Sequence, residues 1–198
     1  MRMTVASDTT RKGRGARERI LAAASRLFAS GGITATSMEQ VAAAAPVSKR
    51  TLYAHFPTRD ELAVAHLRAL VDSGDTMEGV LLREDLDPRE RLLRLFDRPD
   101  TDTPVVRGCP FIDAAAEFPD PEHPVHAYAR EQKLRMVRLV AGLVTELGCP
   151  RPDALAEQLV TLADGAASRA MVLNQGDYGR HGRTAADALL EQALGTPP

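Results

Sequence analysis

The chain has 198 residues, of which 44% are hydrophobic and 26% are charged, an ordinary composition for a packed globular protein. No apolar run is long enough to cross a bilayer, the first ten residues lack the apolar stretch of a signal peptide, and two cysteines are too few for a disulfide framework. The composition therefore predicts a cytoplasmic protein with no membrane partner. Because aromatic residues make up only 4% and Trp is absent, it also favours helix over strand.

The net charge of −2 hides a difference between two parts of the sequence. Residues 1–57 carry nine Lys and Arg against three Asp and Glu, a net charge of +6, whereas the remainder carries 16 against 24, a net charge of −8. A basic segment on an acidic body suggests that one end meets a polyanion. The alternative is a basic solvated face without a partner, and charge alone does not separate the two.

The first predicted elements in chain order are short. Residues 1–15 are polar and contain glycine, which predicts a flexible basic arm that either contacts DNA or has no partner. Apolar residues at helical spacing then alternate with capping and breaking residues. The predicted helices run from Ala16 to Gly31, from a capping box at Thr36-Ser37-Met38-Glu39 to about Ala44, from a cap at Ser48 to about His55, and from Pro57-Thr58-Arg59-Asp60-Glu61 through Leu70.

Longer helices are predicted beyond Asp75, so that the whole chain is expected to be all-α, with three short helices followed by about six longer ones. Proline is welcome at the first helical position, and it opens three of these elements. The predicted helices are Asp87-Pro88 through Phe96, Phe111 to Phe118, Pro124 to Leu147, Pro152 to Asn174 and Arg183 to Leu194, with an Asp- and Pro-rich loop from Asp97 to Pro104.

The stretch from Thr36 to Phe56 carries the most functional information. Two short helices joined by a tight turn, with basic and hydroxyl side chains opening the second helix, satisfy the requirements of a helix-turn-helix. The second helix of such a motif lies in the major groove, where its first turn reaches base edges and its N-terminal N–H groups suit phosphate oxygens. That first turn holds Ser48, Lys49, Arg50 and Thr51.

Residues 47–62 (VSKRTLYAHFPTRDEL), together with 16–21 (ARERIL) and 27–29 (LFA), resemble the DNA-binding region of the tetracycline-repressor (TetR) family. Residues 107–112 (RGCPFI) and 114–117 (AAAE) also resemble a segment found in one branch of these regulators. The resemblance implies an N-terminal three-helix DNA-binding domain, a C-terminal helical domain for ligand binding and dimerisation, and release of a palindromic operator when a small-molecule effector binds. The corresponding boundaries are 1–15 for the arm, 16–60 for the DNA-binding domain and 61–198 for the rest.

The resemblance also implies roles for individual residues. Lys49, Arg50 and Thr51 match base-reading positions. Pro46 stands where the family usually has glycine, and its ring is expected to hold φ near the value of an ordinary turn. The positions that match phosphate contacts are Thr36, Ser37, Ser48, Tyr53, His55 and Arg59.

An effector site is expected in the C-terminal part, where large apolar side chains could line a cavity for an apolar or aromatic molecule. Asn174 or His126 could orient such a ligand by hydrogen bonds. Each apolar residue on its own is equally consistent with plain core packing. The candidate wall residues are Phe96, Phe111, Phe118, Tyr128, Met136 and Met171.

A homodimer is expected because the helix from Pro152 to Asn174 is apolar on two faces, one of them carrying Val160, Ala163 and Ala167. A helix on a monomer's surface needs only one such face. The second face therefore predicts a partner, and pairing with the last helix and with their two copies would give a four-helix bundle.

Other functions remain open. An enzyme is disfavoured because no phosphate loop, nucleophile elbow or paired cysteine motif is present, and no catalytic residue or cofactor is predicted. An architectural DNA protein without a ligand would need a solid C-terminal core. His and carboxylate pairs among Asp113, Glu117, Glu122, His123 and His126 lack a defined full ligand set, so no metal is predicted. Cys109 could be activated by a nearby cation, and an inert thiol is the alternative.

Overall fold

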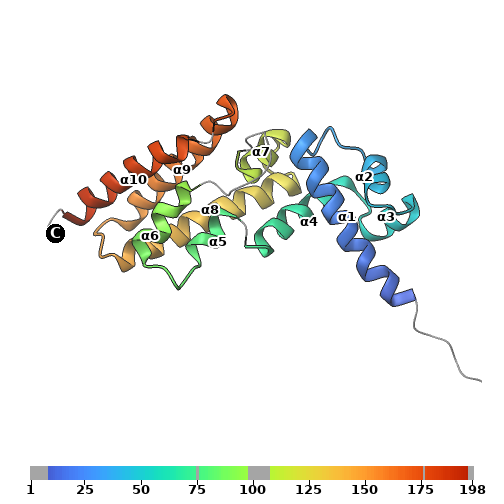
Figure 1. The fold of residues 1–198 in the computed structure, drawn as a ribbon, viewed down its shortest axis with the longest axis horizontal. Coiled ribbons are helices and arrows are strands. Elements are labelled where there is room, and N and C mark those ends of the chain that lie inside the picture. The colour runs from blue at the N-terminus through green and yellow to red at the C-terminus, as the bar shows by residue number, and fades with distance from the viewer. Residues whose placement is uncertain (1–8, 75, 98–107, 176, 196–198) are drawn as a thin grey trace, which may run out of the picture. The chain divides into compact units, whose positions relative to one another are not determined.

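The computed structural model describes residues 9–74, 76–97, 108–175 and 177–195, with side chains from Gly15 onward. These residues form α-helices and one short 3-10 helix, and they contain no strand, which confirms the all-α fold class (Figure 1). The elements are α1 (Thr9–Gly31), α2 (Met38–Ala44), α3 (Lys49–His55), α4 (Arg59–Asp72), α5 (Met77–Leu81), α6 (Pro88–Leu93), η1 (Arg94–Phe96), α7 (Pro110–Glu117), α8 (Pro124–Glu146), α9 (Pro152–Leu173) and α10 (Tyr178–Gly195).

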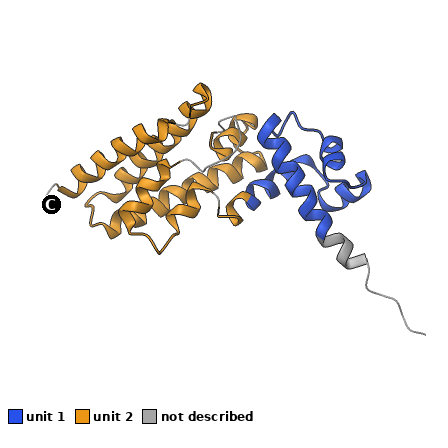
Figure 2. Ribbon diagram, viewed as in Figure 1, with its two compact units in different colours: residues 1–69 blue, residues 70–198 orange. Residues whose placement is uncertain are grey.

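The chain divides into two compact units, residues 1–69 (unit 1) and residues 70–198 (unit 2) (Figure 2). The division falls late in α4, nine residues beyond the boundary expected after residue 60. Helix α1 begins at Thr9, so the segment expected to be an arm is helical from there, and residues 1–8 lie outside the described part. The arm side chains Arg11, Lys12 and Arg14 also lie outside it.

Unit 1 packs the long helix α1, the seven-residue helices α2 and α3, and most of α4 around one small core. Ile20 of α1, Leu52 of α3 and Leu62 of α4 are completely buried. Burial of such a side chain stabilises the folded state by about 1.5–3 kcal/mol, which helps to hold together helices too short to be stable alone. The core thus fixes the position of α3 by its Leu52 face and leaves the opposite face exposed.

A polar side chain, His66 of α4, is buried in this core, with 6% of its surface exposed. A hydrogen bond of 2.9 Å joins its Nδ1 atom to the hydroxyl of Ser25, and the ring of Phe28 meets it edge-on at a centroid distance of 5.3 Å. Burial lowers the pKa of His66 from 6.5 to about 4, because the charged imidazolium would lose its hydration there. Unit 1 therefore contains a neutral histidine.

Unit 2 is built on the long helices α8, α9 and α10, which enclose a core with α5, α6 and η1 (Figure 1). The predicted helices were placed within one residue for α7, α8 and α9, whereas α10 begins five residues before the expected Arg183. Helix α5 was not predicted. Its five residues include the buried Glu78, which pairs with Arg135 of α8 at 2.9 Å, so an inward-facing charge hides the apolar pattern of this helix.

The second apolar face expected on α9 is partly used within the chain itself. Val160 and Ala163 are 5% and 2% exposed and belong to the core of unit 2, and Ala167 is half-buried. Contrary to expectation, Val160 and Ala163 therefore need no second chain to be buried. Further along the same helix, Val172 is 76% exposed and Leu173 is 44% exposed.

The start of α10 lies very close to η1. A Cβ atom at Gly179 would be 2.1 Å from the backbone oxygen of Phe96, and one at Gly182 would be 2.6 Å from the ring of Phe96. Only glycine leaves room for this approach. Phe96, one of the expected pocket residues, is 5% exposed and is enclosed by this contact and by the core of unit 2.

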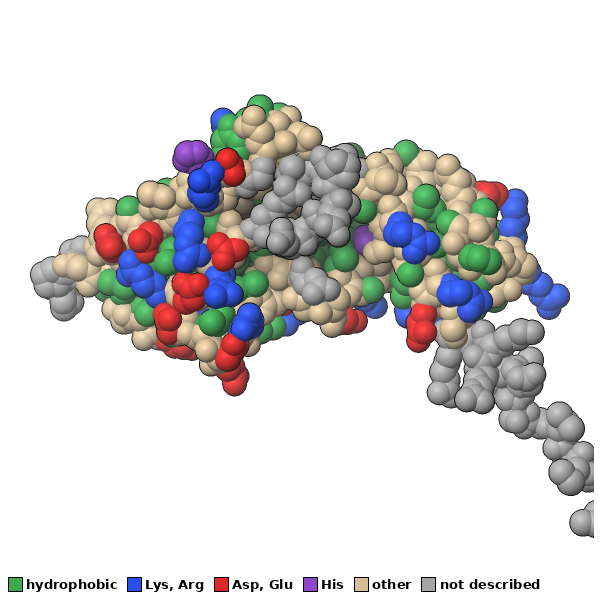
Figure 3. Space-filling view, in the orientation of Figure 1, with side chains coloured by type: hydrophobic (Ala, Val, Ile, Leu, Met, Phe, Trp, Pro, Cys, Tyr) green, Lys and Arg blue, Asp and Glu red, His purple; other side chains and the backbone are tan. Residues whose placement is uncertain are grey.

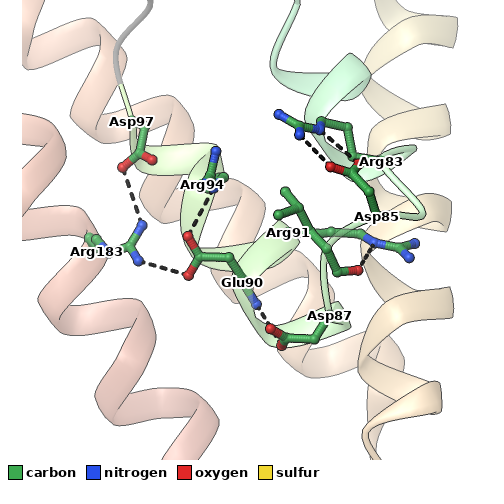
Figure 4. Close-up of polar contacts among 9 residues, drawn as sticks. Arg83, Asp85, Asp87, Glu90, Arg91, Arg94, Asp97 and Arg183 are labelled. Atoms are coloured by element: carbon green, nitrogen blue, oxygen red, sulfur yellow. Dashed lines mark hydrogen bonds and ion pairs between the residues drawn. The ribbon is translucent and has the colours of Figure 1, made fainter.

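Ion pairs connect the same elements. Arg183 of α10 lies 3.1 Å from a carboxylate oxygen of Glu90 and 3.2 Å from one of Asp97, and Glu90 also pairs with Arg94 at 2.9 Å (Figure 4). Nearby, Arg89 of α6 lies 2.6 Å from Asp187 of α10. Figure 3 shows blue and red side chains lying next to one another over the face of unit 2 that it displays. Much of the positive charge in unit 2 is thus matched locally.

Candidate nucleic-acid interface

The start of α2 is fixed by a capping box. The backbone N–H of Gln40 donates to Ser37 Oγ at 3.2 Å, and the N–H of Ser37 donates to Gln40 Oε1 at 2.8 Å. The box therefore lies one residue later than the predicted Thr36 to Glu39. Thr36 is 5% exposed, and its hydroxyl donates to the backbone oxygen of Gly32 at 2.7 Å. This geometry gives Thr36 a core-packing role and does not support its predicted phosphate contact.

The start of α3 is capped as predicted. The N–H of Thr51 donates to Ser48 Oγ at 3.1 Å, and the two hydroxyls lie 2.8 Å apart. On the inner side of the helix Leu52 is completely buried, and Phe56 just beyond the last turn is 3% exposed. Tyr53, on the outer side, is 43% exposed. The hydroxyl groups and the helix N-terminus are thereby held in place next to one another on the surface of unit 1.

Two cations open α3 and have different surroundings. The Nζ atom of Lys49 lies 2.9 Å from Glu39 Oε1 of α2, and both side chains are more than half exposed. A side-chain hydrogen bond from Lys49 lowers the pKa of Glu39, and the same bond raises the pKa of Lys49. Arg50 is exposed and has no hydrogen bond or ion pair with any residue that the structure describes. Glu39 was not among the predicted site residues, and its sequence position showed no sign of this pairing.

His55 and Arg59 are both half-buried. The guanidinium of Arg59 donates from Nη1 to the backbone oxygen of Thr34 at 2.8 Å, and its buried Nε atom has no hydrogen-bond partner. Arg59 thus joins the start of α4 to the loop before α2, and only part of its guanidinium is left for a phosphate.

The turn between the two helices departs from expectation. Pro46 has φ +26°, which differs from the ordinary turn value expected for a proline ring. A proline ring holds φ near −65°, so this residue is strained. The turn between α2 and α3 has a positive φ at this point, and Pro46 adopts it at a cost.

Comparison with known proteins connects this geometry with a family. The sequence model described as "Bacterial regulatory proteins, tetR family" matches residues 20–65, which span about half of α1, the capped α2 and α3, and half of α4. The HTH-type transcriptional regulator YjdC of Escherichia coli is 29% identical over 179 residues, covering 87% of this chain and 93% of its own. The chain is similar to TetR-family regulators, over residues 20–65 in the family model and over most of its length in this relative. It is therefore a DNA-binding transcriptional regulator.

Solved TetR-family structures share the fold along most of their length. A TetR transcriptional regulator from Streptomyces avermitilis superposes with a TM-score of 0.75 at 29% identity, over 90% of this chain and 97% of the other. SCO4454, a TetR-family transcriptional regulator from Streptomyces coelicolor, gives a TM-score of 0.72 at 27% identity, over 91% and 97%. The relatives are regulators rather than enzymes. None of the helices in the described ranges is both long and apolar enough to span a membrane.

The expected effector residues lie on several elements of unit 2. Met136, like Phe96, belongs to the core of unit 2, while Phe111 and Phe118 are buried at the two ends of α7. Asn174 is an exposed residue in the left-handed conformation, φ +49°, and it ends α9 as its C-cap. Met171 is half-buried, and its Sδ atom would lie 3.1 Å from a Cβ at Gly108. Tyr128 is half-buried on α8. The structure therefore assigns structural roles to three of these residues, Phe96, Met136 and Asn174.

The two histidines considered as metal ligands, His123 and His126, form hydrogen bonds with backbone groups. His126 Nδ1 donates to the oxygen of Phe118 at 2.7 Å, and His123 Nδ1 accepts the N–H of Val125 at 3.3 Å and stacks on the Phe118 ring. Within the described part of the chain no three His, Cys, Asp or Glu side chains lie close enough to hold a metal ion. His126 thus caps the end of α7 and has less capacity to orient a ligand.

Cys109 is the N-cap of α7 and is 6% exposed. Burial raises the pKa of its thiol, and the charge of Lys133 opposes this only in part. That environment favours the inert thiol. Arg107, the cation expected beside it, lies outside the described residues. Lys133 itself pairs with Asp164 of α9 at 2.5 Å, and both side chains are about three-quarters buried.

Proposed function

We propose that this regulator is a repressor that binds a palindromic operator as a homodimer and leaves it when a small apolar or aromatic effector binds. The observation that carries the DNA-binding part is the head of α3, where Ser48, Lys49 and Arg50 are exposed beside a half-buried Thr51, opposite the buried Leu52. Base edges in the major groove would be read by Lys49 and Arg50, and phosphates would be met by Ser37, Tyr53 and His55.

The dimer is proposed to form through α9 and α10. Uncharged residues are exposed on α9 at a spacing of three, four and seven positions, which is the repeat of packed helix pairs. Small residues there allow two helices to approach closely. Val172 adds an apolar side chain with 76% of its surface exposed. The exposed uncharged residues are Ala154, Gln158, Thr161, Gly165 and Val172 on α9, and Ala185, Ala188 and Gln192 on α10.

The effector site is proposed to lie at the α7 end of unit 2, among Phe111, Phe118, Tyr128 and Met171. These residues come from α7, α8 and α9, and α7 and α8 pack against one another. Regulation requires that the ligand prefer the conformer that cannot bind DNA, since equal affinity for both conformers shifts nothing. A ligand should therefore stabilise the free protein and weaken DNA binding together.

The deciding experiment compares wild-type protein with the Lys49→Ala/Arg50→Ala variant on the duplex that wild-type protein selects from a random pool. We expect the preference for this duplex over a scrambled one to disappear, because each good base contact contributes about 1–3 kcal/mol of discrimination. A variant that protects the selected site as well as wild-type protein would remove α3 from the proposal. A folded monomer at micromolar concentration in sedimentation would remove the dimer.

A further inference from the structure

The pair formed by Glu39 and Lys49 is the ion pair that joins the two helices of the helix-turn-helix. Glu39 lies in the first turn of α2, Lys49 is the first residue of α3, and the atoms Oε1 and Nζ are 2.9 Å apart. Their side chains are 53% and 65% exposed, so the pair lies on the surface of unit 1 that carries the candidate DNA contacts. An acidic side chain at such a surface opposes binding to a polyanion and requires an explanation.

Stability of the fold does not supply one. Ion pairs between exposed side chains contribute little to the free energy of folding, because both partners are well hydrated when apart. Capping of α2 is already achieved by Ser37 and Gln40, and that of α3 by Ser48. The carboxylate does, however, restrict a flexible four-carbon side chain to one direction. A lysine without such a partner would follow the nearest phosphate, because its ammonium group is a point charge with no directional preference.

We infer that Glu39 is a positioning residue for DNA recognition, which directs the ammonium group of Lys49 and exchanges non-specific affinity for sequence discrimination. The inference rests on the proposed base contact of Lys49. Glu39 lowers binding to every duplex by like-charge repulsion and by neutralising one cation. It improves the ratio between selected and random sequences because Lys49 reaches the groove in one orientation. Arg50, which no described residue holds, supplies the sequence-independent attraction instead.

The pKa directions agree with a permanent charge at this position. A side-chain hydrogen bond from Lys49 lowers the pKa of Glu39, which favours the ionised carboxylate. The pair is therefore present before DNA arrives.

The test uses the full-length protein with Glu39→Gln, which keeps the size of the side chain and removes its charge. The matched control is Glu18→Gln, which removes one negative charge from an exposed position of α1 in the same unit. Affinities for the selected duplex and for a scrambled duplex are measured by fluorescence anisotropy at several salt concentrations. We expect E39Q to bind scrambled DNA about fivefold more tightly, with a salt slope steeper by about 1, because one more cation is available to phosphates.

Discrimination between the two duplexes should fall about tenfold in E39Q and should not change in E18Q. It should fall no further when E39Q is added to Lys49→Ala, because Glu39 acts through that side chain. A second variant, Glu39→Asp, keeps the charge and shortens the reach, so it should lose discrimination while gaining less affinity for scrambled DNA than E39Q. Melting curves followed by circular dichroism show that each variant is folded.

Three results would overturn the inference: unchanged discrimination in E39Q, the same loss in E18Q, or an equal additional loss in the Lys49→Ala background. If Lys49→Ala itself keeps full discrimination, the proposed base contact of Lys49 fails, and the positioning role fails with it. If Lys49→Ala loses discrimination while E39Q keeps it, only the positioning role fails.

Discussion

At the head of α3 in unit 1, Arg50 meets no partner among the described residues, whereas in unit 2 Arg183 is held between the carboxylates of Glu90 and Asp97 (Figure 4). Arg50 lies in the first turn of α3 and Arg183 in the second turn of α10, and only Arg50 has a guanidinium without a described acidic partner. The polar groups inside the two units differ as well. Unit 1 buries the neutral His66, and unit 2 holds the charged pair of Lys133 and Asp164, whose side chains are about three-quarters buried. A count of basic residues therefore indicates a DNA-binding surface only after the internal pairs are removed.

The largest effect that would test this contrast is the acid sensitivity of unit 1. The pKa of His66 is about 4 in the folded protein and about 6.5 when unfolded. The unfolded state therefore binds a proton first as the pH falls. The stabilisation is complete above pH 6.5, declines between pH 6.5 and 4, and amounts to about 3 kcal/mol in all.

Urea unfolding of wild-type protein and of His66→Leu at pH 7 and pH 4.5 measures this effect. We expect a smaller loss of stability on acidification in the variant. The ring-proton resonance of His66 should titrate near pH 4, and titration near pH 6.5 would contradict a neutral buried histidine.

A smaller effect is expected from the paired charges in unit 2. Lys133→Met leaves Asp164 without its cation, with only 24% of that side chain exposed, and should lower the free energy of unfolding by about 2 kcal/mol. The double variant Lys133→Met/Asp164→Leu should recover most of the loss, because an apolar pair needs no hydration. The corresponding change in unit 1, Lys49→Met, should leave stability unchanged, since that pair is exposed. Equal losses in the two units would remove the contrast.

The smallest expected effect concerns the turn of unit 1. Pro46→Gly relieves a φ of +26° but increases the freedom of the unfolded chain, so we expect a net gain of about 1 kcal/mol in unfolding free energy. The same urea titration measures this gain. A loss of stability would mean that proline is not strained at this position. Pro46→Ala is the control, because it removes the ring and keeps a side chain.

The helices of this protein were largely predictable from local chemistry. Ser48 and the chain turn at Pro57 placed α3 at Lys49–His55, because a cap and a breaker act within a few residues. Helix α5 was not predicted, because its buried Glu78 needs the charge of Arg135, which lies far away in the sequence. The φ predicted for Pro46 was wrong for a related reason: the packing of α2 and α3 imposes a φ that proline itself disfavours.

The functional side chains were predictable to a lesser degree. The exposed head of α3 follows from its motif, but the partner of Lys49 is ten residues away and on another helix. The helical spacing of apolar residues did not distinguish residues that line a ligand pocket from residues that pack in the core. Phe96 and Met136 each follow the apolar spacing of their own element, and that spacing is the same whether they face a cavity or a packed core. In this structure both pack against other side chains in the core of unit 2.

The close approach of Gly179 to Phe96 has a consequence for how this protein can diverge. At most positions on a helix surface, exchanging one small residue for another changes the free energy of unfolding very little. At position 179 even one added methyl group would meet a backbone oxygen, which no rotamer change can move aside. At position 182 the obstacle is a ring that has some freedom to turn. In a saturation-mutagenesis library selected for folded protein, we therefore expect no substitution at position 179 and only a few at position 182, although both are glycines within one turn of the same helix.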